Sequence, residues 1–288
     1  MATKPPQAAK AAKAAKAAWT ALEVVHREGV ELVGLARPQV HNAFDESLIA
    51  ELAAAFREAG ANPAVRVVLL HATGPSFCAG ADLDWMKRMA GYGHAENLAD
   101  ANALAEMLAT IAACPKPTVA CVQGAAYGGG VGLIACCDIA IGSSDAMFAL
   151  SEAKLGLIPA TIGPYVAAAI GARHAQRYFI TGERFTAAEA YRIGLLHDIV
   201  PPAELDARVN ELLGALLLAG PEAQREAKLL IRAIANRPID APLIADTAER
   251  IARVRASDEA REGVAAFLDK RSPAWVPRGL RAAAKRRR

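Results

Sequence analysis

Two short glycine-bearing segments constrain the fold of this chain more than any other feature. They span residues 77–83 (FCAGADL) and 124–132 (GAAYGGGVG), and each follows an apolar run with the length of a buried strand. Each segment predicts a turn from a strand into a helix, where the first backbone N–H groups lack an intrahelical acceptor. Two such turns facing one another would offer a pair of donors to one developing oxyanion.

The remaining pattern predicts an α/β body followed by helices. Strands are expected at 22–26, 30–35, 65–71, 118–122 and 138–141. Helices are expected after an N-cap at Asp45, and then at 98–111, 131–137, 187–193, 204–218, 221–234 and 258–267. The chain is mostly helical in pattern from about residue 163. We therefore expect an α/β core over residues 20–200 and a helical region over 201–277.

Charge is concentrated at the two ends of the chain. The formal net charge is +3, yet residues 1–19 carry four lysines and no acid, and residues 278–288 carry six basic residues and no acid. The body between them therefore carries −7. Because a nucleic-acid-binding domain carries its basic surface on folded elements, a nucleic-acid partner is not expected. The ends predict solvated basic tails, the first of low complexity, with contact to polyanions as the alternative.

Hydropathy and cysteine usage indicate in which cellular compartment the protein is expected. No apolar run approaches the roughly 20 residues that a membrane span needs, so a membrane protein is not expected. The five cysteines are an odd number without CxxC spacing. This pattern disfavours structural zinc and predicts a reducing, cytoplasmic compartment.

Glu152 is the acid whose surroundings best suit catalysis. It lies in the mainly apolar stretch 148–159, where a carboxylate has a raised pKa that suits proton transfer. The alternative is a surface glutamate paired with Lys154. Asp82 and Asp84 lie near a predicted helix start and are interpreted as structural, because the helix dipole and free N–H groups favour acids there.

Two other kinds of site fit the sequence poorly. Residues 130–135 match the dinucleotide pattern GxGxxA, but they lie in the middle of the chain and lack the acidic residue that normally follows on the next strand. The six histidines form no HxxxH or HxH pair, and no serine lies in a GxSxG motif. Nucleotide binding and Ser–His catalysis are therefore disfavoured.

Taken together, these segments resemble the enoyl-CoA hydratase/isomerase (crotonase) superfamily over about residues 20–275. The matching stretches are 37–38 with 42–44, 77–83, 124–130, Glu152 with 156–159, 181–183 with 187–190 and 194–195, and 262–263 with 266–271. The resemblance implies an α/β fold built as a spiral of ββα turns with a helical C-terminal oligomerisation region. It also implies a homotrimer or a dimer of trimers.

The resemblance further implies roles for individual positions. Ala81 and Gly129 match the residues whose N–H groups form an oxyanion hole for the thioester carbonyl, and Glu152 matches the second of two catalytic glutamates. The positions that match the neighbourhood of the CoA moiety are Gln39, Val40, Ala79, Asp82 and Leu83, together with Phe267 and Lys270, which often act across a subunit boundary. The implied activity is that of a lyase on an acyl-CoA thioester; the substrate carries the coenzyme A, and neither a metal nor a further cofactor is expected.

One position departs from the family pattern, because the first catalytic glutamate falls at Gly132. Three explanations remain open: Glu152 hydrates alone, the enzyme is an isomerase with one shuttling carboxylate, or the chain binds acyl-CoA with little activity. Residues 128–138 and 150–162 are most similar to a bacterial subgroup that hydrates branched dicarboxylyl-CoA esters, such as the 3-methylglutaconyl-CoA of leucine breakdown. A glycine at 132 is expected to free space for a β-branch or carboxylate, which makes Gly132 a predicted substrate-binding position.

Overall fold

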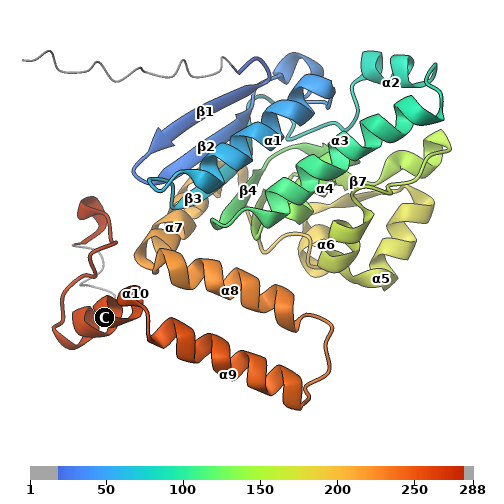
Figure 1. Ribbon diagram of the computed structural model, residues 1–288. Helices are drawn as coiled ribbons and strands as arrows, with labels where there is room; N and C mark the ends of the chain where they lie inside the picture. Colours follow the sequence, from blue (N-terminus) through green and yellow to red (C-terminus); the bar gives the residue numbers. More distant parts are fainter. Residues whose placement is uncertain (1–18, 282–288) are drawn as a thin grey trace, which may run out of the picture.

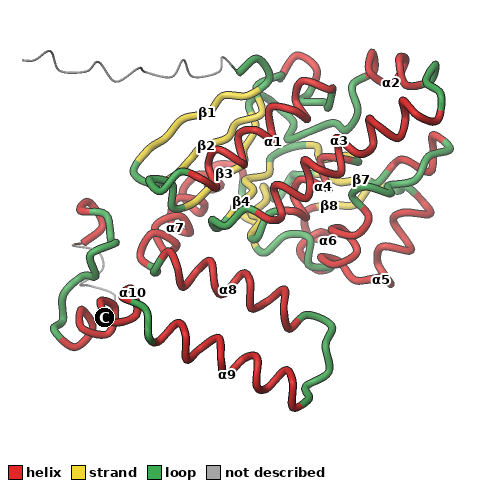
Figure 2. Tube along the Cα trace, viewed as in Figure 1, coloured by secondary structure: helices red, strands yellow, loops and turns green. Residues whose placement is uncertain are grey.

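The main sheet has six strands in the order β1–β2–β3–β4–β6–β9, in a computed structural model that describes residues 19–281 (Figures 1 and 2). The strands are β1 (Leu22–Arg27), β2 (Val30–Leu35), β3 (Val67–Ala72), β4 (Thr118–Val122), β6 (Ile139–Ser143) and β9 (Asp198–Val200). The predicted hairpin pairs β1 with β2 antiparallel, and all other neighbours in this sheet are parallel. The parallel strands therefore present their carboxyl ends along one edge, where ligands bind in sheets of this kind.

The sheet is buried on both faces, which explains the near-continuous apolar runs of its strands. On β3, Val68 and Leu70 contribute to one hydrophobic cluster, whereas Val67 and Leu69 contribute to a second cluster on the opposite face. The first face is covered by α1 (Glu46–Ala61), α3 (His94–Ala113) and α4 (Gly129–Cys136), and α5 (Gly163–Thr181) packs against α4 in the same cluster. Asp45 caps α1 as predicted, because its side chain accepts from the Leu48 amide.

The second face is covered by α7 (Leu205–Leu218), the first helix of the predicted C-terminal region. Its Leu205, Val209, Leu213 and Leu217 recur every four residues and so form one apolar face against the sheet. The short elements α2 (Leu83–Met89) and α6 (Ala187–Arg192) complete the body, together with a second sheet of β5 (Ala125–Tyr127), β7 (Met147–Ala149) and β8 (Arg184–Thr186). These three-residue strands are too short to give a period-two signal in the sequence.

The last helices extend away from the body (Figure 1). They are α8 (Pro221–Ile234), α9 (Ala241–Arg255) and α10 (Asp258–Leu268), and they lie in the stretch predicted to be mostly helical. Of the two predicted tails, residues 1–18 and 282–288 lie outside the described part. Arg278–Leu280 forms a 3-10 turn, and Leu280 packs against the cluster beneath the sheet. Between residues 19 and 281, no helix combines the length and the apolar character required to cross a bilayer.

Lys228 fixes α8 to the body. Its Nζ lies 2.6 Å from Asp138 Oδ2 and donates to the carbonyls of Cys114 (2.7 Å) and Lys116 (2.8 Å). Only 12% of its side chain is exposed, so these bonds are shielded from water. The same Asp138 oxygen accepts from Thr118 at the start of β4, which links the helix to the sheet.

Lys228→Met is therefore expected to lower the free energy of unfolding by about 2–3 kcal/mol, because it removes charge-assisted bonds while leaving the carbonyls and Asp138 in place. Denaturant titration measures the difference. Lys87→Met is the matched control, since Lys87 is 77% exposed and pairs only with the equally exposed Asp84; its loss should change stability by less than about 0.5 kcal/mol. Equal effects of the two variants would contradict the anchoring role.

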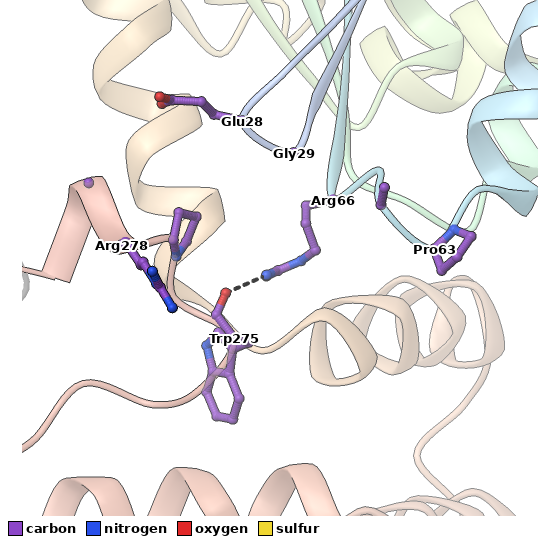
Figure 3. Close-up of a pocket in the computed structure, with 9 residues that line it drawn as sticks. Glu28, Gly29, Pro63, Arg66, Trp275 and Arg278 are labelled. Atoms are coloured by element: carbon purple, nitrogen blue, oxygen red, sulfur yellow. Dashed lines mark hydrogen bonds between the residues drawn. The ribbon is translucent and has the colours of Figure 1, made fainter.

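A pocket of about 430 Å³ lies at the amino end of β3, away from the carboxyl ends of the parallel strands (Figure 3). It is lined by the β1–β2 turn, residues 63–66 and residues 275–279. Arg66 donates there to the carbonyls of Trp275 (3.0 Å) and Ala219 (2.7 Å). The pocket thus marks where the C-terminal segment is held against the sheet, and both glycine segments lie elsewhere.

Candidate active site

The two glycine segments lie side by side beyond the carboxyl ends of β3 and β4. Residue Cys78 of the first segment donates to the carbonyl of Ala125 (3.1 Å) and accepts from the amide of Tyr127 (2.9 Å) in the second. The approach is so close that a Cβ at Gly130 would lie 2.7 Å from the Cys78 carbonyl oxygen. The fold therefore brings together the two segments that the sequence singled out.

The amide of Ala81 is free for a different reason from the one expected. Helix α2 starts only at Leu83, with Asp82 as its N-cap, so Ala81 precedes the helix. Ala81 instead forms an isolated parallel bridge with Phe44, in which Gly80 and Asp82 supply the bonding groups: Phe44 N donates to Gly80 O (2.7 Å) and Asp82 N to Phe44 O (2.8 Å). The N–H of the residue between them points to the opposite side. Within residues 19–281 no acceptor is bonded to it.

Gly129 is the first residue of α4, so its amide is a true helix-start donor. No hydrogen-bond acceptor for it is found in the described part of the chain. A Cβ at this position would lie 2.8 Å from the ring of Phe44. The buried Phe44 therefore touches both donors, because its backbone holds the Ala81 segment and its ring contacts Gly129. Two unbonded amides on segments that Phe44 holds together are the groups that an oxyanion site requires.

Glu152 lies next to Gly128, the residue that precedes Gly129. It belongs to the 3-10 turn Ser151–Leu155, which follows β7, and its Oε1 would lie 3.1 Å from a Cβ at Gly128. Its Oε2 is buried and has no hydrogen-bond partner among the described residues. Burial raises the pKa of the Glu152 carboxyl above its ordinary value of 4.5.

The alternative of a surface glutamate paired with Lys154 is not what the described residues show. The aliphatic part of Lys154 lies against Gly182, where a Cβ would be 3.3 Å from its Cγ and Cε. Glu152 is thus a partly desolvated carboxyl beside Gly128, and its buried Oε2 lacks a partner among the described residues. Such a group can accept a proton and return it to a neighbouring atom.

The residues predicted near the CoA moiety gather around the first glycine segment. Gln39 and Val40 form the 3-10 turn Pro38–Val40, and the amide of Ala79 donates to the carbonyl of the next residue, His41 (3.0 Å). Leu83, at the start of α2, is 73% exposed, and Gln39 is also exposed. An exposed apolar side chain beside exposed polar ones suits a surface that a ligand covers.

Asp82 has the structural role that was expected of it. Its carboxylate accepts from the amides of Asp84 (2.9 Å) and Trp85 (3.3 Å) at the start of α2, and it pairs with Arg37 Nη2 (3.3 Å). Asp84 is exposed and pairs with Lys87. These bonds fix the segment that carries Ala81.

Phe267 and Lys270 lie apart from this group of residues. Phe267 is near the end of α10 and Lys270 just follows that helix, and Figure 1 shows α10 well separated from α2 and α4. The fold of one chain therefore does not bring these two residues to the site. A role for them in binding requires a second copy of the chain.

Gly132 differs from the expectation attached to it. The space that its missing side chain was predicted to free is filled, because a Cβ there would lie 2.8 Å from Ile162 Cβ and closer still to Ile162 Cγ2. Ile162 is itself only 2% exposed. The glycine therefore accommodates a neighbouring side chain of this protein, and room for an acyl branch is not its physical reason.

Two supporting residues were not assigned a role from the sequence. Asn42, fully buried, donates to the carbonyls of Thr73 (2.8 Å) and Ser76 (2.9 Å) and accepts from the Arg37 amide, which fixes the loop after β3. Gln123 donates to Ala72 O (2.8 Å), so it ties the end of β4 to the end of β3. Asn42 lies in the stretch 42–44 that matches the family pattern, but its residue type does not reveal which carbonyls it bonds, and Gln123 belongs to no such stretch.

Comparison with known proteins agrees with this geometry. The enoyl-CoA hydratase/isomerase family matches residues 26–278. A putative enoyl-CoA hydratase of Thermus thermophilus is 31% identical, over 86% of this chain and 98% of the relative, and a crotonyl-CoA hydratase of Syntrophomonas wolfei is 31% identical, over 86% and 95%. The crystal structure of an enoyl-CoA hydratase from Shewanella pealeana is 44% identical with a TM-score of 0.87, covering 89% of this chain and 96% of that one. The predicted crotonase-type fold is confirmed, and the chain belongs to the enoyl-CoA hydratase/isomerase family.

Proposed function

We propose that this member of the enoyl-CoA hydratase/isomerase family adds water across the double bond of a 2-enoyl-CoA thioester, with Glu152 as its proton-transfer group. The observation that carries the proposal is the placement of one unpaired, partly desolvated carboxyl beside Gly128, adjacent to the free amide of Gly129. The amides of Ala81 and Gly129 receive the thioester oxygen. The proposed reaction requires neither a metal nor a resident cofactor.

The proposed reaction balances with one carboxylate. Ionised Glu152 accepts a proton from water while the water oxygen bonds to C3 of the enoyl group. The electron pair of the double bond moves towards the thioester oxygen, where the two N–H groups stabilise the enolate. Glu152 then returns the proton to C2, the carbonyl re-forms, and the carboxylate is regenerated.

The substrate we propose is a branched dicarboxylyl-CoA such as 3-methylglutaconyl-CoA. Position 132 carries no carboxylate, because it is a glycine. A second glutamate there would repel an acyl group that carries its own carboxylate, since like charges at close range are unfavourable. The absence of a negative charge at position 132, and not free volume there, thus supports a substrate that carries its own carboxylate.

We further propose that the working form is a homotrimer or a dimer of trimers, in which Phe267 and Lys270 contact the CoA moiety bound by a neighbouring copy. The separation of α10 from the glycine segments supports this, because these residues do not reach the site within one chain (Figure 1). Gln39, Val40, Ala79 and Leu83 would contact the same moiety from the home chain. Asp82 would act indirectly, by holding Ala81.

A panel of acyl-CoA esters tests the function. We expect hydration of 3-methylglutaconyl-CoA with a kcat/KM at least about tenfold above that for crotonyl-CoA, which corresponds to about 1.4 kcal/mol of discrimination. Product analysis by mass spectrometry measures the gain of one water. A preference for crotonyl-CoA would overturn the substrate assignment while leaving hydration intact.

Isomerisation is the second candidate, because a lone carboxylate is sufficient to move a proton between C2 and C4. Incubation with a 3-enoyl-CoA and with a 2-enoyl-CoA separates the two reactions. Conversion of the first into the second without mass gain would favour the isomerase. Tight binding of both esters without conversion would show an acyl-CoA-binding protein instead.

A further inference from the structure

Position 132 lies one helical turn after Gly128, the residue that faces Glu152. Gly132 lies in the first turn of α4, and its amide donates to the carbonyl of the N-cap residue Gly128 (3.3 Å). Gly128 is the residue that faces the Glu152 carboxyl. Because the Cα–Cβ bonds of a helix tilt towards its N-terminus, a long side chain at 132 would extend back towards residue 128 and Glu152.

The side chain of Ile162 lies in that path. A Cβ at Gly132 would be 2.8 Å from Ile162 Cβ, a separation that real Cβ atoms essentially never show. Leu108 Cδ2, at 3.7 Å, closes another side at ordinary contact distance. The volume that a residue at 132 would need is therefore occupied from the chain's own core.

Ile162 has little freedom to move aside. It is 2% exposed and belongs to the main hydrophobic cluster. Its carbonyl accepts from the amides of Tyr165 (3.1 Å) and Val166 (3.0 Å), which fixes its backbone as the start of α5. A β-branched side chain also has few accessible rotamers. Relief of the contact requires a shorter residue at 162.

We infer that Gly132 and Ile162 form an interlocked pair, in which Ile162 excludes a second carboxylate from position 132. Any side chain at 132 strains the core as long as residue 162 keeps its Cβ. The inference rests on the proposed function for its catalytic part, because it takes Glu152 as the proton-transfer group. Its packing part stands on the geometry alone.

A double-mutant cycle on stability tests the packing part. Gly132→Ala is expected to lower the Tm by roughly 5 °C, since overpacking a core strains it. In the background Ile162→Gly the same change should be neutral or raise the Tm, because alanine is the better helix former. Gly214→Ala on α7, where no atom lies within 4 Å of the new Cβ, is the control and should not lower the Tm. An equal loss in both backgrounds would overturn the interlock.

The pH dependence of turnover tests the catalytic part. Gly132→Glu alone is expected to lower kcat/KM at least about tenfold and to lower the Tm. Gly132→Glu combined with Ile162→Gly should admit the second carboxylate, so the profile of kcat/KM changes from one ionisation to two coupled ionisations. A Gly132→Glu single variant with parental Tm and activity, or a folded double variant with one ionisation, would refute the assignment.

The two failures are distinguishable. If Glu152→Gln kept full activity, the proposed function would be wrong, and the Tm cycle would still measure whether residues 132 and 162 interlock. If the Tm cycle were additive, the interlock would be wrong whatever Glu152 does.

Discussion

Glu152→Gln is expected to reduce turnover of the 2-enoyl-CoA substrate by about 10²–10⁴-fold, because general acid–base catalysis contributes that much and the amide cannot accept the proton. Binding of the CoA ester should be nearly unchanged, since the substitution keeps shape and leaves both donor amides in place. Steady-state kinetics and calorimetric titration measure the two quantities. Glu58→Gln, an exposed position on α1, is the matched control and should be fully active. Retained activity in Glu152→Gln would refute the catalytic assignment.

The same variant should be more thermostable than the parent at neutral pH. Burial raises the pKa of Glu152 in the folded state, so between the ordinary value of 4.5 and the raised one the folded protein binds more protons than the unfolded chain. Stability therefore falls as the pH rises through this window. Glutamine does not ionise, so the variant does not lose this stability. The difference in Tm between Glu152→Gln and the parent should vanish below pH 4.5, the ordinary pKa of a glutamate. A Tm difference that persists in acid would point to packing instead.

Ala81→Pro is expected to lower kcat by about 10²–10³-fold, the typical effect of deleting one oxyanion donor. Proline removes the N–H without adding a charge. The bridge to Phe44 should survive, because Gly80 O and Asp82 N make its bonds and the Ala81 amide makes none that the described residues show. Steady-state kinetics with the ester that the panel identifies as the substrate measures kcat.

Ala81→Ser separates the amide from the side chain. Residue 81 is exposed, so serine keeps the N–H and fits without strain, and near-parental kcat is expected. Circular dichroism and Tm show whether Ala81→Pro is folded. A folded proline variant with full activity would exclude the Ala81 amide from the oxyanion site.

The elements with a strong local signal could be predicted from the sequence. The hairpin of β1 and β2 alternates in part, and β3 and β4 are buried apolar runs because helices of the first cluster cover one face and α7 the other. The cap at Asp45 follows from residue type and position. The second sheet could not be predicted, because its three-residue strands carry no period and exist only through pairing with one another.

The candidate site could be predicted only in part. The two glycine segments and Glu152 stand out by type and spacing, and the fold places them together. The source of the free Ala81 amide could not be foreseen, since it depends on a bridge to Phe44, 37 positions earlier in the chain. The filling of the space at Gly132 was equally hidden, because Ile162 reaches it from the start of another helix. Both depend on contacts between segments, which residue type alone does not encode.

The central claim is that one carboxylate, Glu152, performs the proton transfer. The pH dependence of kcat/KM for 3-methylglutaconyl-CoA, or for whichever ester the panel selects, tests it most directly. The claim predicts that activity rises with pH through a single ionisation whose midpoint lies above 4.5, because the base must be ionised and burial raises its pKa. The residual activity of Glu152→Gln should not show this rise with pH. Two acidic ionisations, or a limb that survives in the glutamine variant, would contradict the claim.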